Sequence, residues 1–179
     1  MRSISYRVAL GGIVSALCLV TMFLAGVIPA LYLVLPMAAG ILMMIISAEV
    51  SKSWALLTYI SVSLLSMFIT FDKEAALIFI MLFGHYPILR LYTVKIPLKG
   101  LRMALRTAIF NVCVIAYYYV TVYIFGLDQM ADELSDYGRY GAYVMLGLAN
   151  ILFLLYDLNL DSIYRIYLKR LAPKFKKNR

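Results

Sequence analysis

The stretch 72–90, DKEAALIFIMLFGHYPILR, decides how the rest of the chain is interpreted. Within it, residues 75–89 are apolar except for His85 and Tyr86, and the apolar run continues through Tyr92, giving the ~20 residues that a helix needs to cross a bilayer. Acidic residues precede this span, and a basic cluster follows it, made up of Arg90, Lys95, Lys99, Arg102 and Arg106. Because cytoplasmic loops of membrane proteins are rich in Lys and Arg, we predict a transmembrane helix whose basic end is cytoplasmic.

The composition of the whole chain supports this interpretation. Hydrophobic residues make up 64% of the sequence and the mean hydropathy is +0.89, whereas soluble domains contain about 45–50% apolar residues. A chain of 179 residues has room for about six spans of ~20 residues with short loops and no separate soluble domain. The net charge of +8 then belongs to cytoplasmic loops and is no sign of nucleic-acid binding.

We therefore predict an all-α, polytopic membrane protein that forms a single domain over residues 1–179. The first apolar segment is longer than the ~7–15 residues of a signal-peptide core, so we expect it to remain as a span. With both termini in the cytoplasm, fifteen of the seventeen Lys and Arg residues are cytoplasmic, all but Lys73 and Arg139. The predicted spans are 8–28, 30–48, 54–71, 75–92, 104–125 and 139–160, with residues 93–103 along the membrane surface and a basic cytoplasmic tail at 161–179.

The first span has one face made of small residues. Ala9, Gly12 and Ala16 follow one another at helical spacing. In lipid, small side chains allow two helix backbones to approach closely. Two interpretations remain open, because this face either packs inside the bundle or docks onto another subunit.

Polar residues recur along one stripe of the sixth span and one stripe of the fifth. Tyr143, Asn150 and Asp157 lie on the first stripe, and Asn111 and Tyr118 lie on the second. Because a polar group in lipid needs a partner, we expect both stripes to face inward. Asn111 and Asn150 either contact a ligand or hold the two helices together by hydrogen bonds, and Asp157 alternatively pairs with Arg106 or is hydrated near the inner surface.

Tyrosines 117, 118 and 119 are consecutive in the fifth span, so at least one of them faces the bundle. An inward tyrosine near the outer surface suits stacking on a planar ligand, although tyrosines at this depth also occur in the aromatic belts of membrane proteins. We take Tyr118 and Tyr119, with Tyr143 and Asn150, as candidate substrate-binding residues.

His85 is the only histidine and lies near mid-depth in the fourth span. It is a candidate substrate contact or proton carrier, or a hydrogen-bonded core residue. Gly84 and Pro87 favour a break in the helix beside it. No second His, Cys or carboxylate stands at metal-ligand spacing, and no phosphate loop, HExxH or GxSxG motif occurs, so we expect no metal, no cofactor, no catalytic residues and no enzymatic activity.

Six short spans, cytoplasmic termini, a small-residue face on the first span and a compact outer link after it resemble the substrate-binding S components of energy-coupling factor (ECF) vitamin transporters. In that family the first helix carries Ala-x-x-x-Ala, and the nearest match here is Gly12-x-x-x-Ala16. The resemblance implies a cell-membrane protein that binds a vitamin-like molecule on its outer side and docks through Ala9, Gly12 and Ala16 onto a transmembrane coupling subunit. Two cytoplasmic ATPase subunits would then drive transport.

A second interpretation is a membrane scaffold that resembles the rod-shape-determining family and holds partners in a cell-envelope complex. A third is an enzyme that acts on lipid. Copurified partners distinguish them, because paired ATPases indicate transport whereas cell-wall or cytoskeletal proteins indicate scaffolding.

Overall fold

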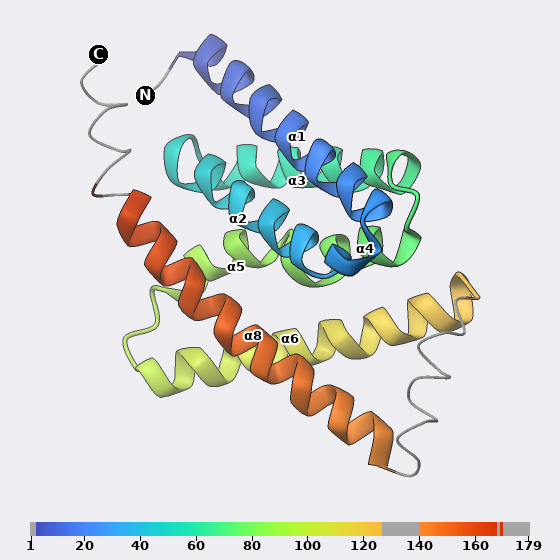
Figure 1. Ribbon diagram of the computed structural model, residues 1–179. Coiled ribbons are helices and arrows are strands. Elements are labelled where there is room, and N and C mark those ends of the chain that lie inside the picture. The colour runs from blue at the N-terminus through green and yellow to red at the C-terminus, as the bar shows by residue number, and fades with distance from the viewer. Residues whose placement is uncertain (1–2, 127–139, 168, 170–179) are drawn as a thin grey trace.

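The computed structural model describes residues 3–126, 140–167 and 169, and every regular element within these ranges is helical (Figure 1). The all-α prediction is confirmed for this part of the chain. The elements in chain order are α1 (Ile4–Val27), the 3-10 helix η1 (Pro29–Leu31), α2 (Val34–Glu49), α3 (Lys52–Ile69), α4 (Lys73–Ile78), the π-helix η2 (Phe79–Phe83), α5 (Tyr86–Thr93), α6 (Lys99–Tyr119), the π-helix η3 (Val120–Ile124) and α8 (Gly141–Ile166).

Five helical stretches of the described chain are long and apolar enough to cross a membrane, namely 4–27, 52–69, 73–93, 99–124 and 141–166. The helix α2 is apolar but shorter, with 16 residues. The stretches 4–27, 52–69 and 73–93 lie within a few residues of predicted spans, whereas α6 begins at Lys99 and not at about 104, and α8 continues to Ile166 and not to about 160. Residues 99–103 are thus helical, and the surface position predicted for residues 93–103 stays a prediction. Pro97 ends the preceding turn, and Lys99, Leu101 and Arg102 readily continue a helix.

The stretch 73–93 forms the centre of the bundle. In its most apolar window 67% of the residues are buried, against 17–28% in the other four long stretches. It contacts α1, α2, α3 and α6, and the whole run 75–79 is buried. A helix surrounded on all sides has no polar face, which explains why this segment is apolar around its full circumference.

Charged side chains at both ends of the central helix tie it to its neighbours. Asp72 caps its first turn, since the Asp72 carboxylate accepts hydrogen bonds from the backbone N–H groups of Glu74 at 2.9 Å and Ala75 at 3.2 Å. Lys73 donates to the carbonyls of Met67 and Thr70 at the end of α3. We call this the acidic end, after Asp72 and Glu74.

At the opposite end, Lys52 at the start of α3 donates to the carbonyl of Leu91 at 3.4 Å and lies 3.9 Å from the centre of the Tyr92 ring. We call this the basic end, after Arg90, Arg102 and Arg106.

The break predicted around Gly84 and Pro87 is confirmed. Residues 79–83 form a π-helix, and the N–H of Gly84 donates to the carbonyl of Phe79 at 2.7 Å. A Cβ at position 84 would lie 2.8 Å from that carbonyl oxygen and 2.9 Å from the ring of Tyr59, so only glycine fits without movement. The chain then re-enters a helix at Tyr86, with Pro87 in the first turn.

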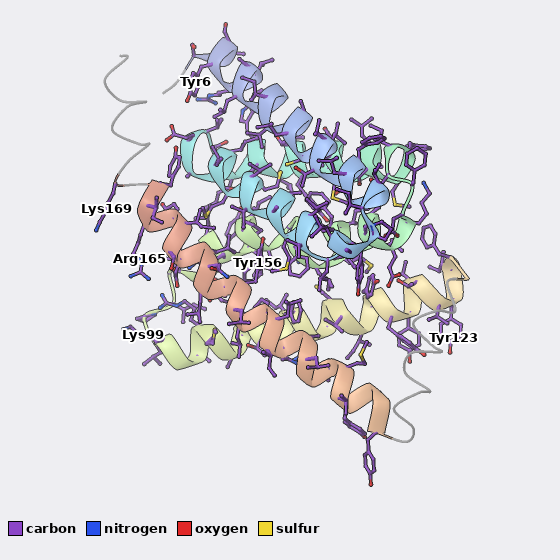
Figure 2. The ribbon with its side chains drawn as sticks, viewed as in Figure 1. Tyr6, Lys99, Tyr123, Tyr156, Arg165 and Lys169 are labelled. Carbon is purple, nitrogen blue, oxygen red and sulfur yellow. The ribbon has the colours of Figure 1, made fainter. Side chains whose placement is uncertain are left out.

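Two apolar clusters meet at α2 and the central helix. One lies among α1, α2, α3 and α4 and contains Cys18, Met43, Val62 and Phe79. The other joins α2 and the central helix to α6 and α8, and contains Phe83, Phe110, Phe153 and Tyr156. Tyr156 is fully buried in the middle of the molecule (Figure 2). A Cβ added at Gly40 would lie only 2.5 Å from the Tyr156 hydroxyl oxygen. Glycine at position 40 therefore lets α8 approach α2 closely.

Candidate functional site

A cavity of about 750 Å³ lies among α6, α8 and the central helix, on the side of the acidic end. Its walls are largely apolar, with Leu82 and Phe83 from the central helix and Val114, Met145 and Leu152 from α6 and α8. Most ligand pockets in proteins occupy about 300–1,000 Å³ and have this kind of lining, with a few polar groups. The cavity is therefore large enough for a small organic molecule.

The crossing of α6 and α8 creates this space. Phe110 and Phe153 stack where the helices meet, with ring centres 4.3 Å apart and planes at 17°. Beside them the side-chain amide of Asn150 donates to the amide oxygen of Asn111 at 2.8 Å. From the crossing, the later part of the stretch 99–124 and the first turns of α8 diverge (Figure 1). The interpretation of Asn111 and Asn150 as residues that hold two helices together is thus confirmed.

One charged side chain lines the cavity among the described residues, and it is Glu74. The Tyr117 hydroxyl donates to Glu74 Oε1 at 2.9 Å, which links the first turn of α4 to α6. Tyr117 is 3% exposed, so this hydrogen bond is largely shielded from solvent. A carboxylate in an apolar cavity is a strong acceptor and favours ligands that carry a hydrogen-bond donor or a positive charge.

The predicted binding residues Tyr118 and Tyr119 also line the cavity. Their ring centres are 5.8 Å apart in an edge-to-face arrangement, and Tyr119 stacks in turn on Tyr123 at 5.6 Å. Tyr123 lies near the end of this helical stretch (Figure 2). Three neighbouring aromatic rings therefore extend from the cavity toward the end of this helical stretch, and their faces suit stacking on a planar ligand.

The other three predicted binding residues do not line the cavity. His85 lies in the break of the central helix, with its ring centre 6.2 Å from that of Tyr59 and its Nε2 3.8 Å from Cys113 Sγ. Asn150 binds Asn111 and the carbonyl of Leu146. Tyr143 is 75% exposed. Its predicted inward position is wrong, because α8 crosses the bundle obliquely and its first turns diverge from the other helices.

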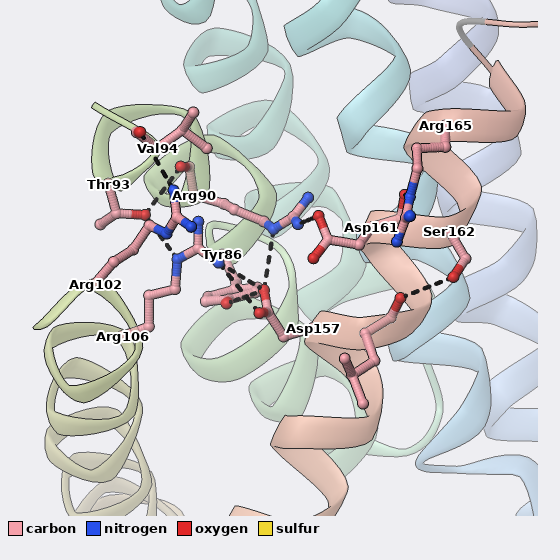
Figure 3. Close-up of polar contacts among 11 residues, drawn as sticks. Tyr86, Arg90, Thr93, Val94, Arg102, Arg106, Asp157, Asp161, Ser162 and Arg165 are labelled. Atoms are coloured by element: carbon pink, nitrogen blue, oxygen red, sulfur yellow. Dashed lines mark hydrogen bonds and ion pairs between the residues drawn. The ribbon is translucent and has the colours of Figure 1, made fainter. Parts of the chain in front are cut away.

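A buried cluster of charges lies at the basic end, around Asp157 of α8 (Figure 3). Tyr86 Oη donates to Asp157 Oδ1 at 2.6 Å, and Arg90 Nε donates to the same oxygen at 3.0 Å. Arg106 Nη1 lies 3.1 Å from Asp157 Oδ2. The alternative that Asp157 pairs with Arg106 is confirmed. This carboxylate joins α5, α6 and α8 at one point.

The same cluster extends to two further residues. Arg90 forms a second ion pair with Asp161, and Arg106 Nε donates to the Thr93 hydroxyl at 2.8 Å. From the sequence we predicted Arg90 to belong to the basic cluster after the fourth span. In the structure its side chain is buried. A signal was present, because Arg90 follows Tyr86 by four residues and therefore lies on the same face of the helix.

The small residues predicted for docking are on the surface of α1. Ala9, Gly12 and Ala16 are exposed, and a Cβ at Gly12 would have no described atom within 4 Å. The helix packs against the bundle through a different face, formed by Gly11, Val14, Cys18, Met22 and Ala25. The described part of the chain therefore does not cover the predicted docking face.

Comparison of the chain with protein-family models, curated proteins and solved structures found no match. Among the described residues, no group of three or more His, Cys, Asp or Glu side chains is arranged to hold a metal ion. The cavity and the exposed face of α1 are therefore the two features that bear on function.

Proposed function

We propose that this chain is a substrate-binding membrane subunit of an importer and resembles the S components of ECF transporters. It binds a vitamin-like small molecule and depends on other subunits for energy. The observation that carries the proposal is the cavity of about 750 Å³. Its lining is largely apolar and includes Glu74, which accepts a hydrogen bond from Tyr117, as well as Tyr118 and Tyr119. This combination suits a planar heterocycle that donates a hydrogen bond to the carboxylate.

The proposal includes six spans with both termini in the cytoplasm. A helix of 16 residues is about 24 Å long, which is shorter than the ~30 Å hydrocarbon core. The η1 turn precedes α2 almost directly and is also apolar, so 29–49 together provide enough length for a sixth crossing. In this orientation the acidic end, and with it the cavity, faces the outside of the cell.

The exposed face of Ala9, Gly12 and Ala16 supports a docking role. A flat strip of small residues lets a helix of another subunit approach the backbone of α1 closely. In the proposed complex this strip contacts a transmembrane coupling subunit, and two cytoplasmic ATPases supply the energy for transport. The chain itself hydrolyses nothing.

The binding proposal is tested with purified protein in detergent, by thermal shift and native mass spectrometry against a panel of vitamins and nucleobases. We expect at least one heterocycle to stabilise the protein. Glu74→Gln and Tyr118→Ala should each weaken its binding by about tenfold or more, because a charge-assisted hydrogen bond and an aromatic contact are lost. Tyr143→Ala is the matched control, since Tyr143 does not line the cavity.

Two results would contradict the proposal. One is that no compound in the panel stabilises the protein, and the other is that Tyr143→Ala weakens binding as much as Tyr118→Ala. Affinity purification from gently solubilised membranes tests the partners separately. Copurified cell-wall or cytoskeletal proteins, without an ATPase pair, would favour the membrane scaffold instead.

A further inference from the structure

A second, smaller cavity of about 260 Å³ lies at the basic end, between the last turn of α5, the first turns of α6 and the end of α8. It is separate from the proposed substrate cavity and shares no lining residue with it. Three guanidinium groups and one carboxylate line it, from Arg90, Arg102, Arg106 and Asp161. Figure 3 shows Arg90 and Arg106 beside Asp157, Asp161 beside Arg90, and Arg102 reaching toward Val94.

The charges of this cluster do not balance. Asp157 pairs with both Arg90 and Arg106, and Asp161 pairs with Arg90. Within the described chain Arg102 has no carboxylate partner, and its Nη1 reaches only the carbonyl of Val94 at 3.5 Å. Three arginines against two aspartates therefore leave one positive charge in excess. In a partly buried site an uncompensated positive charge is destabilising, and a bound anion removes this destabilisation.

The hydrogen-bond donors are not all used either. Each guanidinium has five N–H donors, and here Arg90 binds aspartates through Nε and Nη2, whereas Arg106 uses Nε and Nη1. Arg90 Nη1 and Arg106 Nη2 have no protein acceptor within the described residues. Because both residues line the cavity, these donors are available to a ligand that carries several acceptor oxygens.

We propose that this cavity binds a phosphate group, either the phosphodiester of a lipid headgroup, which carries one negative charge, or free inorganic phosphate, which carries one or two. One such charge neutralises the excess of the cluster, and planar guanidinium groups bind phosphate oxygens in pairs. Arg102 lies in the first turn of α6, where the helix dipole also favours an anion. The apolar wall of Met44, Leu91 and Val94 beside the arginines is compatible with the glycerol and first methylene groups of a lipid.

The position of the cavity agrees with a headgroup site. It lies at the end of three membrane-length helical stretches, close to the exposed residues Lys95 and Lys99. Basic pockets between transmembrane helices at this depth bind lipid phosphates. The inference does not depend on the proposed importer function, because it uses neither the larger cavity nor the face of α1.

The test uses full-length protein and the variant Arg102→Gln, which removes the uncompensated charge and leaves every buried ion pair in place. Lys99→Gln is the control, since it removes one exposed charge from the same turn of α6 without touching the cavity. Binding of phosphatidylglycerol, phosphatidic acid and diacylglycerol is measured by native mass spectrometry. Inorganic phosphate is titrated against thermal stability, with sodium chloride at equal ionic strength as the reference.

We expect retention of one phosphate-bearing lipid, or stabilisation by inorganic phosphate beyond that of chloride, and no retention of diacylglycerol. Lipid retention without a phosphate effect identifies a headgroup as the ligand, and the reverse identifies free phosphate. Arg102→Gln should weaken binding by about five- to tenfold and Lys99→Gln by much less. Three results would overturn the proposal. The first is an equal loss of binding in the two variants, and the second is equal retention of diacylglycerol. The third is protein that retains no lipid and is stabilised equally by phosphate and chloride.

Discussion

The two ends of the α6–α8 pair are built differently. At the basic end Asp157 holds α5, α6 and α8 together through Tyr86, Arg90 and Arg106. At the acidic end the same two helices diverge, and the cavity between them is closed toward α4 by the hydrogen bond from Tyr117 to Glu74. The helices are therefore fixed at one end by charge and left apart at the other.

This difference indicates a division between stability and binding. A buried carboxylate shared by two arginines contributes to the fold only while all three groups are present, because each charge depends on the others. Within residues 3–126 and 140–167 the diverging end has few polar contacts, and its walls are largely apolar, which suits a ligand site. Substitutions at the basic end should therefore affect folding, whereas substitutions at the acidic end should affect binding more than folding.

The largest expected effect comes from Asp157→Asn. It leaves two buried guanidinium groups with only Asp161 to balance them, and removal of one partner from a buried ion pair costs about 3–5 kcal/mol. Thermal unfolding in detergent can be followed in a Cys113→Ser background through Cys18, whose fully buried thiol reacts with a maleimide dye only when the protein opens. Asp161→Asn is the control, and its effect should stay below about 1 kcal/mol because its side chain is 48% exposed. Similar losses for both variants would show that the buried Asp157 is no more important to the basic end than the half-exposed Asp161.

A second test concerns how closely α8 is held against α2. Gly40→Ala places a methyl group 2.5 Å from the Tyr156 hydroxyl and 2.6 Å from the carbonyl of Phe83, so we expect a loss of about 1–3 kcal/mol. Gly12→Ala is the matched control, because no described atom lies within 4 Å of its added methyl group. It should leave stability unchanged or raise it slightly, since alanine favours a helix. A neutral Gly40→Ala would mean that α8 is not held tightly at this position.

Most helices were predictable because an apolar run that ends in charges marks them, whereas α1 and α2 are separated by the uncharged link 28–33. The helix ends were less predictable, since they depend on local capping, such as Ser3 at the start of α1 and Asp72 at the start of α4. The central position of residues 73–93 was visible only in part. An apolar circumference is compatible with burial and with contact to lipid, and only the packing of the other helices decides between them.

The site was predictable to a smaller extent. Tyr118 and Tyr119 were found because consecutive tyrosines must point in different directions around a helix. Glu74 and Tyr117 are 43 residues apart, and no local pattern indicates that they meet. Tyr143 was misplaced because helical spacing gives a face of α8 but not the angle at which α8 crosses α6. Crossing angles arise from packing between particular side chains, here Phe110 and Phe153.

At the acidic end, Tyr117→Phe removes a single hydrogen bond and keeps the ring in place. We expect a loss of about 1 kcal/mol in the free energy of unfolding, well below the effect of Asp157→Asn. Binding of the ligand found in the vitamin screen should change more than stability does, because the Glu74 carboxylate loses one of the contacts that orient it. A loss of stability as large as that of Asp157→Asn would show that the acidic end also holds the fold together.

The smallest expected effect lies at the crossing point between the two ends. Asn111→Ala and Asn150→Ala, alone and together, form a double-mutant cycle that measures the hydrogen bond of 2.8 Å between the two amides. Hydrogen bonds between transmembrane helices contribute about 0.6 kcal/mol on average, because each partner finds another acceptor when the first is lost. Asn150 already has one, since it also donates to the carbonyl of Leu146 in its own helix. A coupling near 0.6 kcal/mol would therefore show that α6 and α8 are held chiefly by Asp157 and the Phe110–Phe153 stack, whereas a coupling above about 2 kcal/mol would move the main anchor from the basic end to the crossing.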